Sequence, residues 1–352
     1  MPEPIPRNAR VLYALPHAVM VVVAVIDVVA GPSVGFLPLV ALGPAFAGLV
    51  GGWRRTALIG VLALLLCAGL GLYDGLFADR RGLTALASVA GVTVASLWAA
   101  VLRQRRENEL ARIRSIAEVV QRVLLRPAPH SAGGLDVAVS YTSALAEARV
   151  GGDLYEVVDS PAGVRVIVGD VQGKGLEAVG TAALLLGAFR EAAHLEPDLG
   201  SVCERLERAA DRELRGEKFV TAVVAEVGPD HRVTMVNYGH PSPLMVDSGG
   251  SVTSLDPPTH APPLGLGLPG PERPAAHSTS LAPGDQLLLY SDGVTEARGA
   301  DRRFYPLAER CASLLHPDPK VTLTMLRADL MRYTGSPLHD DAVMLLLRRP
   351  GP

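Results

Sequence analysis

This 352-residue sequence has few cysteines and little net charge, and it lacks the motifs of a kinase or cyclase domain. Its three cysteines, Cys67, Cys203 and Cys311, lie far apart without a CxxC pair, which argues against a disulfide framework or a cysteine zinc site. The net charge is −3, and no block of lysine and arginine is interleaved with aromatic residues. This composition does not indicate nucleic-acid binding. No GxGxxG run is followed by a strand lysine, and no GGDEF-like run occurs, so a kinase or cyclase output domain is not indicated.

Charged residues are also scarce up to about Leu102, where four apolar stretches follow one another. They are Val11 to Ala30, Val34 to Val50, Thr56 to Tyr73 and Gly82 to Leu102. Each is close to the ~20 residues that cross a bilayer, and a cleaved signal peptide would explain only one of them. Residues 1–102 are therefore predicted to form an all-α transmembrane bundle of about four helices; buried helices of a soluble core are the alternative. No internal repeat or pair of broken helices indicates a transporter or channel.

Basic residues at the ends of these stretches predict their orientation. Three groups fall on one side of a four-span bundle: Arg7 with Arg10, Arg54 with Arg55, and Arg103 with Arg105 and Arg106. Arginine-rich connections favour the cytoplasm, so this side is predicted to be cytoplasmic in a multi-pass protein of the cell membrane. Arg80 and Arg81 fall on the opposite side, where Asp74 and Asp79 partly offset them.

One acidic residue, Asp27, lies inside the first apolar stretch. An ionisable group there is costly unless it faces the bundle interior or a partner. It is interpreted either as a sensing residue or as a side chain that stays wet near the membrane surface, and the sequence leaves both open.

Residues 103–130 are predicted to be a connector that begins with a helix. Apolar side chains recur at three- and four-residue intervals at Leu110, Ile113, Ala117, Val120 and Leu124. This spacing places them on one face of a helix that Pro127 would end. The stripe would pair with its twin in a homodimer, or it would pack on the domain that follows. Ser131, Gly133 and Gly134 are expected to form a loose joint before that domain.

Beyond Gly134, short β-type runs alternate with turns, and two helical stretches are predicted at Leu176 to His194 and Leu199 to Leu214. Aspartates stand at or near the ends of apolar runs, at Asp153, Asp170, Asp292, Asp340 and Asp341. Carboxylates gathered in this way repel one another unless divalent cations are bound, and oxygen-only ligation suits Mg²⁺ or Mn²⁺ better than zinc. Adjacent glycines permit tight turns and close backbone approach: Gly151, Gly152, Gly173, Gly175 and Gly293.

Seven motifs occur in an order that resembles the type 2C metal-dependent protein phosphatases. They are GGDLYE, VIVGDVQGKGLEA, FVTA, NYGHPSPL, PLGLG, GDQLLLYSDGVTEAR and HDDAVMLLL. The resemblance runs from about Leu135 to Arg348 and is closer to the bacterial branch of sporulation stage II and stress-regulator phosphatases. It implies an α+β fold for residues 131–352, an antiparallel β-sandwich flanked by helices.

Residue by residue, the resemblance makes Asp170 the carboxylate that bridges two Mn²⁺ or Mg²⁺ ions, with the backbone carbonyl of Val171 as a further ligand. Asp292 and Asp340 complete the set, and Asp153 binds one ion directly or through water. In the family's mechanism the two ions activate a shared water for in-line attack on phosphorus. Asp170 and Asp292 are thus the predicted catalytic residues.

Other positions are predicted to support the site or to touch substrate: Gly152, Lys174, His240 and Asp341. His240 is interpreted as a structural hydrogen-bonding residue ahead of a catalytic one, and the role of Asp341 stays open. The sequence also departs from the family pattern. Glu156 and Tyr238 replace an aspartate and an alanine, and Gln172 stands where eukaryotic members carry a histidine, so no general acid is assigned. Arg126 and Arg149 are basic residues near the first motif with no decided role.

The sequence therefore predicts a membrane-anchored, metal-dependent protein serine/threonine phosphatase with a cytoplasmic catalytic domain. The resemblance implies that its partner is a phosphorylated cytoplasmic protein, an anti-sigma-factor antagonist in this branch. The alternative is a catalytically weak signalling scaffold that keeps the fold and binds a partner; it would require missing ligands, whereas all the expected acids are present.

Overall fold

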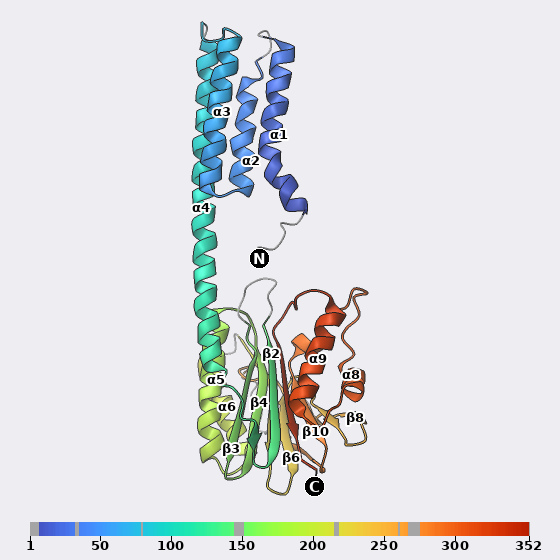
Figure 1. The fold of residues 1–352 in the computed structure, drawn as a ribbon. Helices are drawn as coiled ribbons and strands as arrows, with labels where there is room; N and C mark the ends of the chain where they lie inside the picture. The colour runs from blue at the N-terminus through green and yellow to red at the C-terminus, as the bar shows by residue number, and fades with distance from the viewer. Residues whose placement is uncertain are drawn as a thin grey trace. The chain divides into compact units, whose positions relative to one another are not determined.

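The computed structural model describes residues 7–31, 35–78, 80–143, 151–214, 218–259, 261–266 and 275–351. The chain divides into two compact units, one up to Ile113 and one from Arg114 onward. The division falls inside the long helix α4 (Arg80–Leu124), which contains both the fourth apolar stretch and most of the predicted connector. One unit is built of helices and the other of sheets and helices (Figure 1).

The first unit is entirely helical. It contains α1 (Arg7–Ala30), the 3₁₀ helix η1 (Leu37–Ala41), α2 (Leu42–Val50), α3 (Trp53–Tyr73) and the first part of α4. By length and composition, three segments are long and apolar enough to cross a membrane: Tyr13–Ala30, Trp53–Tyr73 and Arg80–Ile113. The second predicted stretch is shorter, Leu37–Val50, and begins in a 3₁₀ turn where Pro38 lacks the N–H that a longer helix would need. A fourth crossing therefore stays a prediction.

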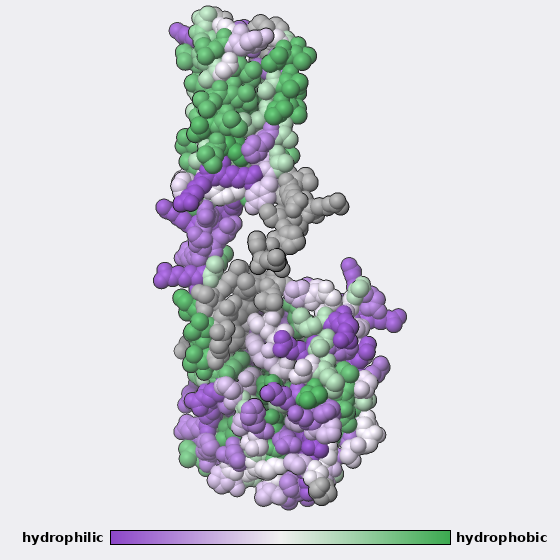
Figure 2. All heavy atoms as spheres, viewed as in Figure 1, coloured by the Kyte–Doolittle hydropathy of each residue, from purple (hydrophilic) through white to green (hydrophobic). Residues whose placement is uncertain are grey.

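Apolar side chains cover the outside of these helices (Figure 2). Val29, Leu58 and Leu72 are 81%, 72% and 71% exposed, an arrangement that suits contact with lipid rather than water. The acidic Asp27, by contrast, is only 2% exposed. It therefore lies inward among the helices rather than wet at their surface.

Two arginines tie the helices together at one end of the unit. The Arg55 guanidinium donates to the carbonyl of Tyr13, and Arg103 donates to the carbonyl of Gly48 at 3.0 Å. Since Gly48 lies near the end of α2 and Arg55 near the start of α3, the basic groups of two connections gather at the same end of the helices.

The second unit is a sandwich of two antiparallel sheets with helices on both outer faces (Figure 1), which confirms the predicted fold class. One sheet has the order β1 (Ser131–Ala132), β2 (Leu135–Thr142), β11 (Ala342–Arg348), β10 (Gln286–Tyr290), β7 (Leu244–Val246) and β8 (Val252–Ser254). The other has the order β3 (Leu154–Ser160), β4 (Gly163–Val171), β5 (Val220–Val227), β6 (Arg232–Tyr238) and β9 (His277–Ser280).

Both faces of the central strands are buried, so these strands read as nearly continuous apolar runs. In β4, Val166 and Val168 pack between the sheets. The alternate residues Ile167 and Val171 pack against helices α5 (Leu176–Leu195) and α6 (Leu199–Leu214). Side chains that alternate along the strand thus build two separate cores.

The other sheet is covered by α8 (Leu307–Ser313) and α9 (Pro319–Thr334), two helices absent from the sequence prediction. The ends of α9 carry standard signals. Asp318 caps its start by accepting the Lys320 N–H at 2.8 Å, Pro319 follows, and Gly335 ends it with a φ of 60°. These signals were present in the sequence and were missed.

The predicted loose joint is a tight turn instead. Gly133 and Gly134, with φ of 51° and 79°, connect β1 to β2, and Ala132 pairs with Leu135 across them. Glycine adopts these left-handed conformations readily, as a two-residue hairpin loop requires.

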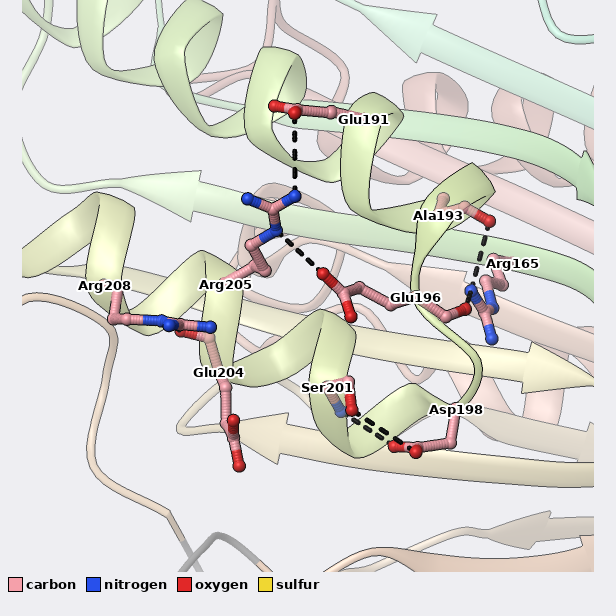
Figure 3. A network of polar contacts seen from close by, with 9 residues as sticks. All are labelled: Arg165, Glu191, Ala193, Glu196, Asp198, Ser201, Glu204, Arg205 and Arg208. Atoms are coloured by element: carbon pink, nitrogen blue, oxygen red, sulfur yellow. Dashed lines mark hydrogen bonds and ion pairs between the residues drawn. The ribbon is translucent and has the colours of Figure 1, made fainter.

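A polar network fixes helices α5 and α6 to the sheet below them (Figure 3). Arg165, fully buried on β4, donates to the carbonyls of Ala193 and Glu196 at 3.1 and 2.7 Å and also binds Glu226. The Glu196 side chain in turn accepts from Arg205 of α6 at 2.9 Å. One buried arginine therefore anchors the connection between the two helices.

The last residues of α4 pack within the second unit. Leu124 packs against Val179 of α5, and its carbonyl accepts from Arg190 at 2.8 Å. The earlier part of the apolar stripe is open: Leu110, Ile113 and Val120 are 52%, 43% and 39% exposed. The side chain of Ala117 lies outside the described residues. Packing on the following domain thus accounts for the end of the stripe only.

Candidate active site

Strand pairing gathers the aspartates at one end of the sandwich. In one sheet Leu154 pairs with Gly169, which brings Asp153, just before β3, next to Asp170 near the end of β4. In the other sheet Tyr290 pairs with Met344, so Asp292 after β10 lies near Asp340 and Asp341 before β11. Asp153, Asp170 and Asp292 each offer one carboxylate oxygen, and these oxygens lie within 4.8 Å of one another.

Asp153 is buried, Asp170 and Asp292 are half-buried, and the three carboxylates repel one another. Burial, together with the charge of Asp170, raises the pKa of Asp153 well above its usual range. Burial and the charges of Asp292 and Asp340 raise the pKa of Asp170 to about 7. The pKa of Asp292 is raised as well, by burial and then by Glu296 and Asp340. A set of oxygen donors with surplus negative charge fits hard divalent cations such as Mg²⁺ or Mn²⁺.

Gly152 allows the first motif to lie directly against this cluster. A Cβ at this position would stand 2.3 Å from the carbonyl oxygen of Val171 and 2.9 Å from Oδ1 of Asp170. The Val171 N–H donates to the carbonyl of Gly152 at 3.2 Å. The predicted backbone ligand Val171 therefore lies beside Asp170, in a cradle that any larger residue at position 152 would fill.

Asp340 lies at the exposed edge of the cluster. Its Oδ1 pairs with Lys174 Nζ at 3.1 Å and accepts the Asp341 N–H at 3.0 Å. Lys174, predicted either to support the site or to touch substrate, thus forms an ion pair with a candidate ligand in this structure. Both side chains are partly exposed, so the pair is open to exchange with an anionic substrate.

Asp341 is 2% exposed and points toward β2. It accepts hydrogen bonds from the hydroxyls of Tyr141 and Ser143. A Cβ on Gly151 would stand 2.5 Å from its Oδ2. The structure therefore connects Asp341 to the adjacent strand and to the first motif, a positioning arrangement that the sequence did not assign.

Ser291 is a site residue that sequence reasoning missed. It is fully buried; its hydroxyl donates to Asp153 Oδ2 at 2.6 Å and accepts the Val343 N–H at 3.0 Å. It thereby fixes one carboxylate of the cluster from the opposite sheet. Its position directly before Asp292 in YSDG was the only signal.

His240 lies behind the cluster, 6% exposed. Its ring Nδ1 is 2.9 Å from Thr221 Oγ1, and Thr221 pairs with Asp170 across β4 and β5. The His240 N–H donates to Asn237 Oδ1 at 2.8 Å. Burial lowers the pKa of His240 to about 4, so the ring is neutral near pH 7. These contacts suit a structural residue.

The three residues that depart from the family pattern, Glu156, Tyr238 and Gln172, lie in different surroundings. Glu156 pairs with Arg190, and the buried Tyr238 donates to Glu207 at 2.7 Å. Gln172 is exposed. The carbonyl of Arg126 accepts from Tyr155 at 3.1 Å. Arg149 lies outside the described residues.

A helix-flanked double sheet with an aspartate cluster at one end defines a protein serine/threonine phosphatase domain of the PP2C type. The family model of stage II sporulation protein E matches residues 160–350, more than half of the chain. The chain belongs to the stage II sporulation protein E family.

Individual relatives agree with this assignment. The phosphoserine phosphatase RsbU of Bacillus subtilis is 26% identical over 242 residues, 66% of this chain and 69% of the relative. The structure of the RsbU and RsbW domains of Rv1364c from Mycobacterium tuberculosis matches with a TM-score of 0.51 and 27% identity, over 62% of this chain and 61% of that chain. The SiaA PP2C domain of Pseudomonas aeruginosa matches in fold with a TM-score of 0.54 and 19% identity, over 70% of this chain and 98% of that domain.

Proposed function

We propose that this protein is a membrane-anchored phosphatase that hydrolyses phosphoserine or phosphothreonine on a cytoplasmic regulatory protein. The observation that carries this proposal is the set of three carboxylate oxygens within 4.8 Å, contributed by Asp153, Asp170 and Asp292. A cluster of partly buried like charges destabilises the fold unless a cation or a proton offsets the repulsion, and such clusters are typical of functional sites.

The residues that would hold two divalent cations are Asp153, Asp170, Asp292, Asp340 and the carbonyl of Val171. When bound, the ions supply an activated water and offset charge on the phosphoryl oxygens. The protein's own part is positioning. Ser291 orients Asp153, Gly152 keeps the Val171 carbonyl accessible, and Lys174 can leave Asp340 for the phosphate of the substrate because the pair is partly exposed.

Membrane anchoring is supported by the three long apolar helices. The arginines that gather at one end of them, Arg55 and Arg103 among those described, favour that end as the cytoplasmic one. The catalytic unit follows α4, which begins beyond the opposite end of α3 at Arg80, and so would lie in the cytoplasm.

The contacts at the end of α4 support a route from the membrane helices to the site. Arg190 binds both the Leu124 carbonyl and Glu156, and Tyr155 binds the Arg126 carbonyl. Tyr155 and Glu156 follow Asp153 directly on β3. A rotation of α4 would therefore pull on the strand that carries a cluster carboxylate. The exposed stripe residues Leu110, Ile113 and Val120 are proposed to pair with a second copy of the chain.

The proposed substrate is a phosphorylated anti-sigma-factor antagonist. The support is the family assignment and the relative named a phosphoserine phosphatase. The alternative, a scaffold that binds such a protein without turnover, is disfavoured because the acids of the cluster are present and brought together.

The test uses the full chain in detergent, with p-nitrophenyl phosphate and a phosphoserine peptide as probes, in Mn²⁺, in Mg²⁺ and in EDTA. Hydrolysis should require the metal, and Asp170→Ala and Asp292→Ala should each lower kcat by at least about 100-fold. Asp230→Ala, an exposed aspartate of a distant turn, is the matched control and should retain activity. Mn²⁺ binding without hydrolysis in the wild type would establish the scaffold instead.

A further inference from the structure

A cavity of about 220 Å³ lies directly beside the aspartate cluster. Its lining includes Gly293, Glu296, Arg298, Ser336, His339 and Asp340. Asp340 belongs to the proposed metal site, and Gly293 follows Asp292. A phosphoserine whose phosphate lies at the cluster would therefore have its neighbouring residues at the mouth of this cavity.

Arg298 is an exposed residue that lines this cavity. Within the part of the chain that the structure describes, it makes no ion pair, although Glu296 lines the same cavity. Its guanidinium carbon lies 4.6 Å from the ring centroid of Phe304. Stacking on an aromatic face holds an arginine in place while its N–H groups remain free to bind a carboxylate.

Phe304 is 54% exposed. A large aromatic side chain left exposed next to an arginine is the combination that is enriched in protein–protein contacts. Phe304 follows Arg298 after a short turn, and the backbones of the two residues pair as an antiparallel β-bridge.

The turn that carries this pair is held by hydrogen bonds on several sides. The Tyr305 N–H donates to the carbonyl of Ala297 at 2.9 Å, and the Tyr333 hydroxyl donates to the carbonyl of Phe304 at 3.1 Å. Tyr333 also packs edge-on against Tyr305. A surface fixed before binding loses little conformational entropy when a partner docks.

We propose that Arg298 and Phe304 form a docking site for the polypeptide next to the phosphoserine. Arg298 pairs with an acidic side chain of the substrate, and Phe304 packs against an apolar one. This inference rests on the proposed phosphatase function and adds to it a preference for phosphoserine sites with an acidic neighbour.

The experiment compares phosphoserine peptides that carry Asp, Ala or Lys beside the phosphoserine with p-nitrophenyl phosphate, which has no flanking chain. It uses the full chain in detergent with Mn²⁺. Arg298→Ala should lower the ratio of kcat/KM for the Asp peptide to that for p-nitrophenyl phosphate about fivefold, mainly through KM. It should also abolish the preference for Asp over Ala. Phe304→Ala should lower the ratio for all three peptides, and it should also reduce the preference for Asp because it removes the ring that holds Arg298 in place.

The matched control is Arg303→Ala. Arg303 lies on the same turn, pairs with Asp301 at 3.5 Å and is not part of the cavity lining, so its removal should leave the ratio and the Asp preference as in the wild type. Fluorescence anisotropy of the labelled Asp peptide measures docking without turnover, and Arg298→Ala should weaken binding by the same factor.

An equal loss for peptide and p-nitrophenyl phosphate in Arg298→Ala, or an unchanged Asp preference, would overturn the docking site. If the wild type hydrolyses neither probe, the proposed function fails, and anisotropy alone then decides whether Arg298 binds the acidic peptide.

Discussion

Without a bound cation, the aspartate cluster lowers the free energy of unfolding. This loss of stability can be measured because it depends on pH. Asp170 has a pKa of about 7 in the folded chain against 3.8 for the free side chain, because of burial and then of Asp292 and Asp340. At pH values between these two pKa values, Asp170 is ionised in the unfolded chain and protonated in the folded chain. A carboxyl with a raised folded pKa therefore makes the protein less stable as pH rises through this window.

The magnitude follows from about 1.4 kcal/mol per pKa unit. Across the whole window Asp170 costs at most about 4 kcal/mol, of which about 3 kcal/mol appears between pH 5 and pH 8. Asp170→Asn removes the titration while keeping the shape of the side chain. The EDTA-treated wild type should therefore lose about 3 kcal/mol more stability than this variant between pH 5 and pH 8, and Mn²⁺ should restore the wild type alone.

A suitable assay is amide hydrogen exchange of the buried strands β4 and β10 in the full chain. Exchange of these amides reports the free energy of opening of the unit that contains them. Each rate is corrected for the intrinsic exchange rate at its pH. Asp230→Asn serves as the control, since that aspartate is exposed. Equal pH dependence in the wild type and Asp170→Asn would show that neither burial nor the neighbouring carboxylates raise the pKa of Asp170, and the metal-site argument would fail with it.

Three further substitutions test individual contacts. Ser291→Ala removes a hydrogen bond to a cluster carboxylate and should weaken Mn²⁺ affinity about 10- to 100-fold in a calorimetric titration. Gly152→Ala, whose Cβ would meet the Val171 carbonyl at 2.3 Å, should reduce kcat at least about 100-fold, whereas Gly180→Ala on open helix surface should be active and slightly more stable. Arg165→Met leaves buried acceptors unpaired and should lower the free energy of unfolding by about 3–5 kcal/mol. The half-buried Arg205→Met should lower it by under about 1 kcal/mol, and denaturant midpoints measure both changes.

Each comparison has a contrary outcome. Unaltered metal affinity without the serine hydroxyl would mean that the carboxylate needs no positioning. Equal activity of the two glycine variants would remove the close backbone approach from the argument, and equal midpoints for the two arginine variants would show that the buried network does not anchor the helices.

The sequence was informative wherever a pattern is local. Apolar periodicity placed the β-type runs and the helices at Leu176 and Leu199 close to their observed bounds. Seven ordered motifs indicated the phosphatase family, and aspartates at strand ends marked the cluster. Helix α9 is absent from the sequence prediction although Asp318 and Gly335 signal its ends, because its apolar residues do not form a pronounced stripe that would indicate a helix.

Contacts between residues far apart in the sequence could not be predicted in the same way. Ser291 reaches Asp153 across 138 positions of sequence, and Tyr141 reaches Asp341 across 200. Such partners depend on which strands pair and in which register, and a local pattern does not contain that information. The same holds for the ion pair of Lys174 with Asp340, because the sequence alone left open whether Lys174 supports the site or touches substrate.

The sequence by itself determined the family, the apolar N-terminal third and the identities of the acids, because these reside in composition and in motifs read along the chain. Only the folded structure shows that Asp153, Asp170 and Asp292 meet within 4.8 Å, that Asp27 lies inward, and that Arg298 lines the same cavity as Asp340. The physical reason is that antiparallel pairing of distant strands brings their ends together, and burial there sets the charge interactions that the chemistry uses.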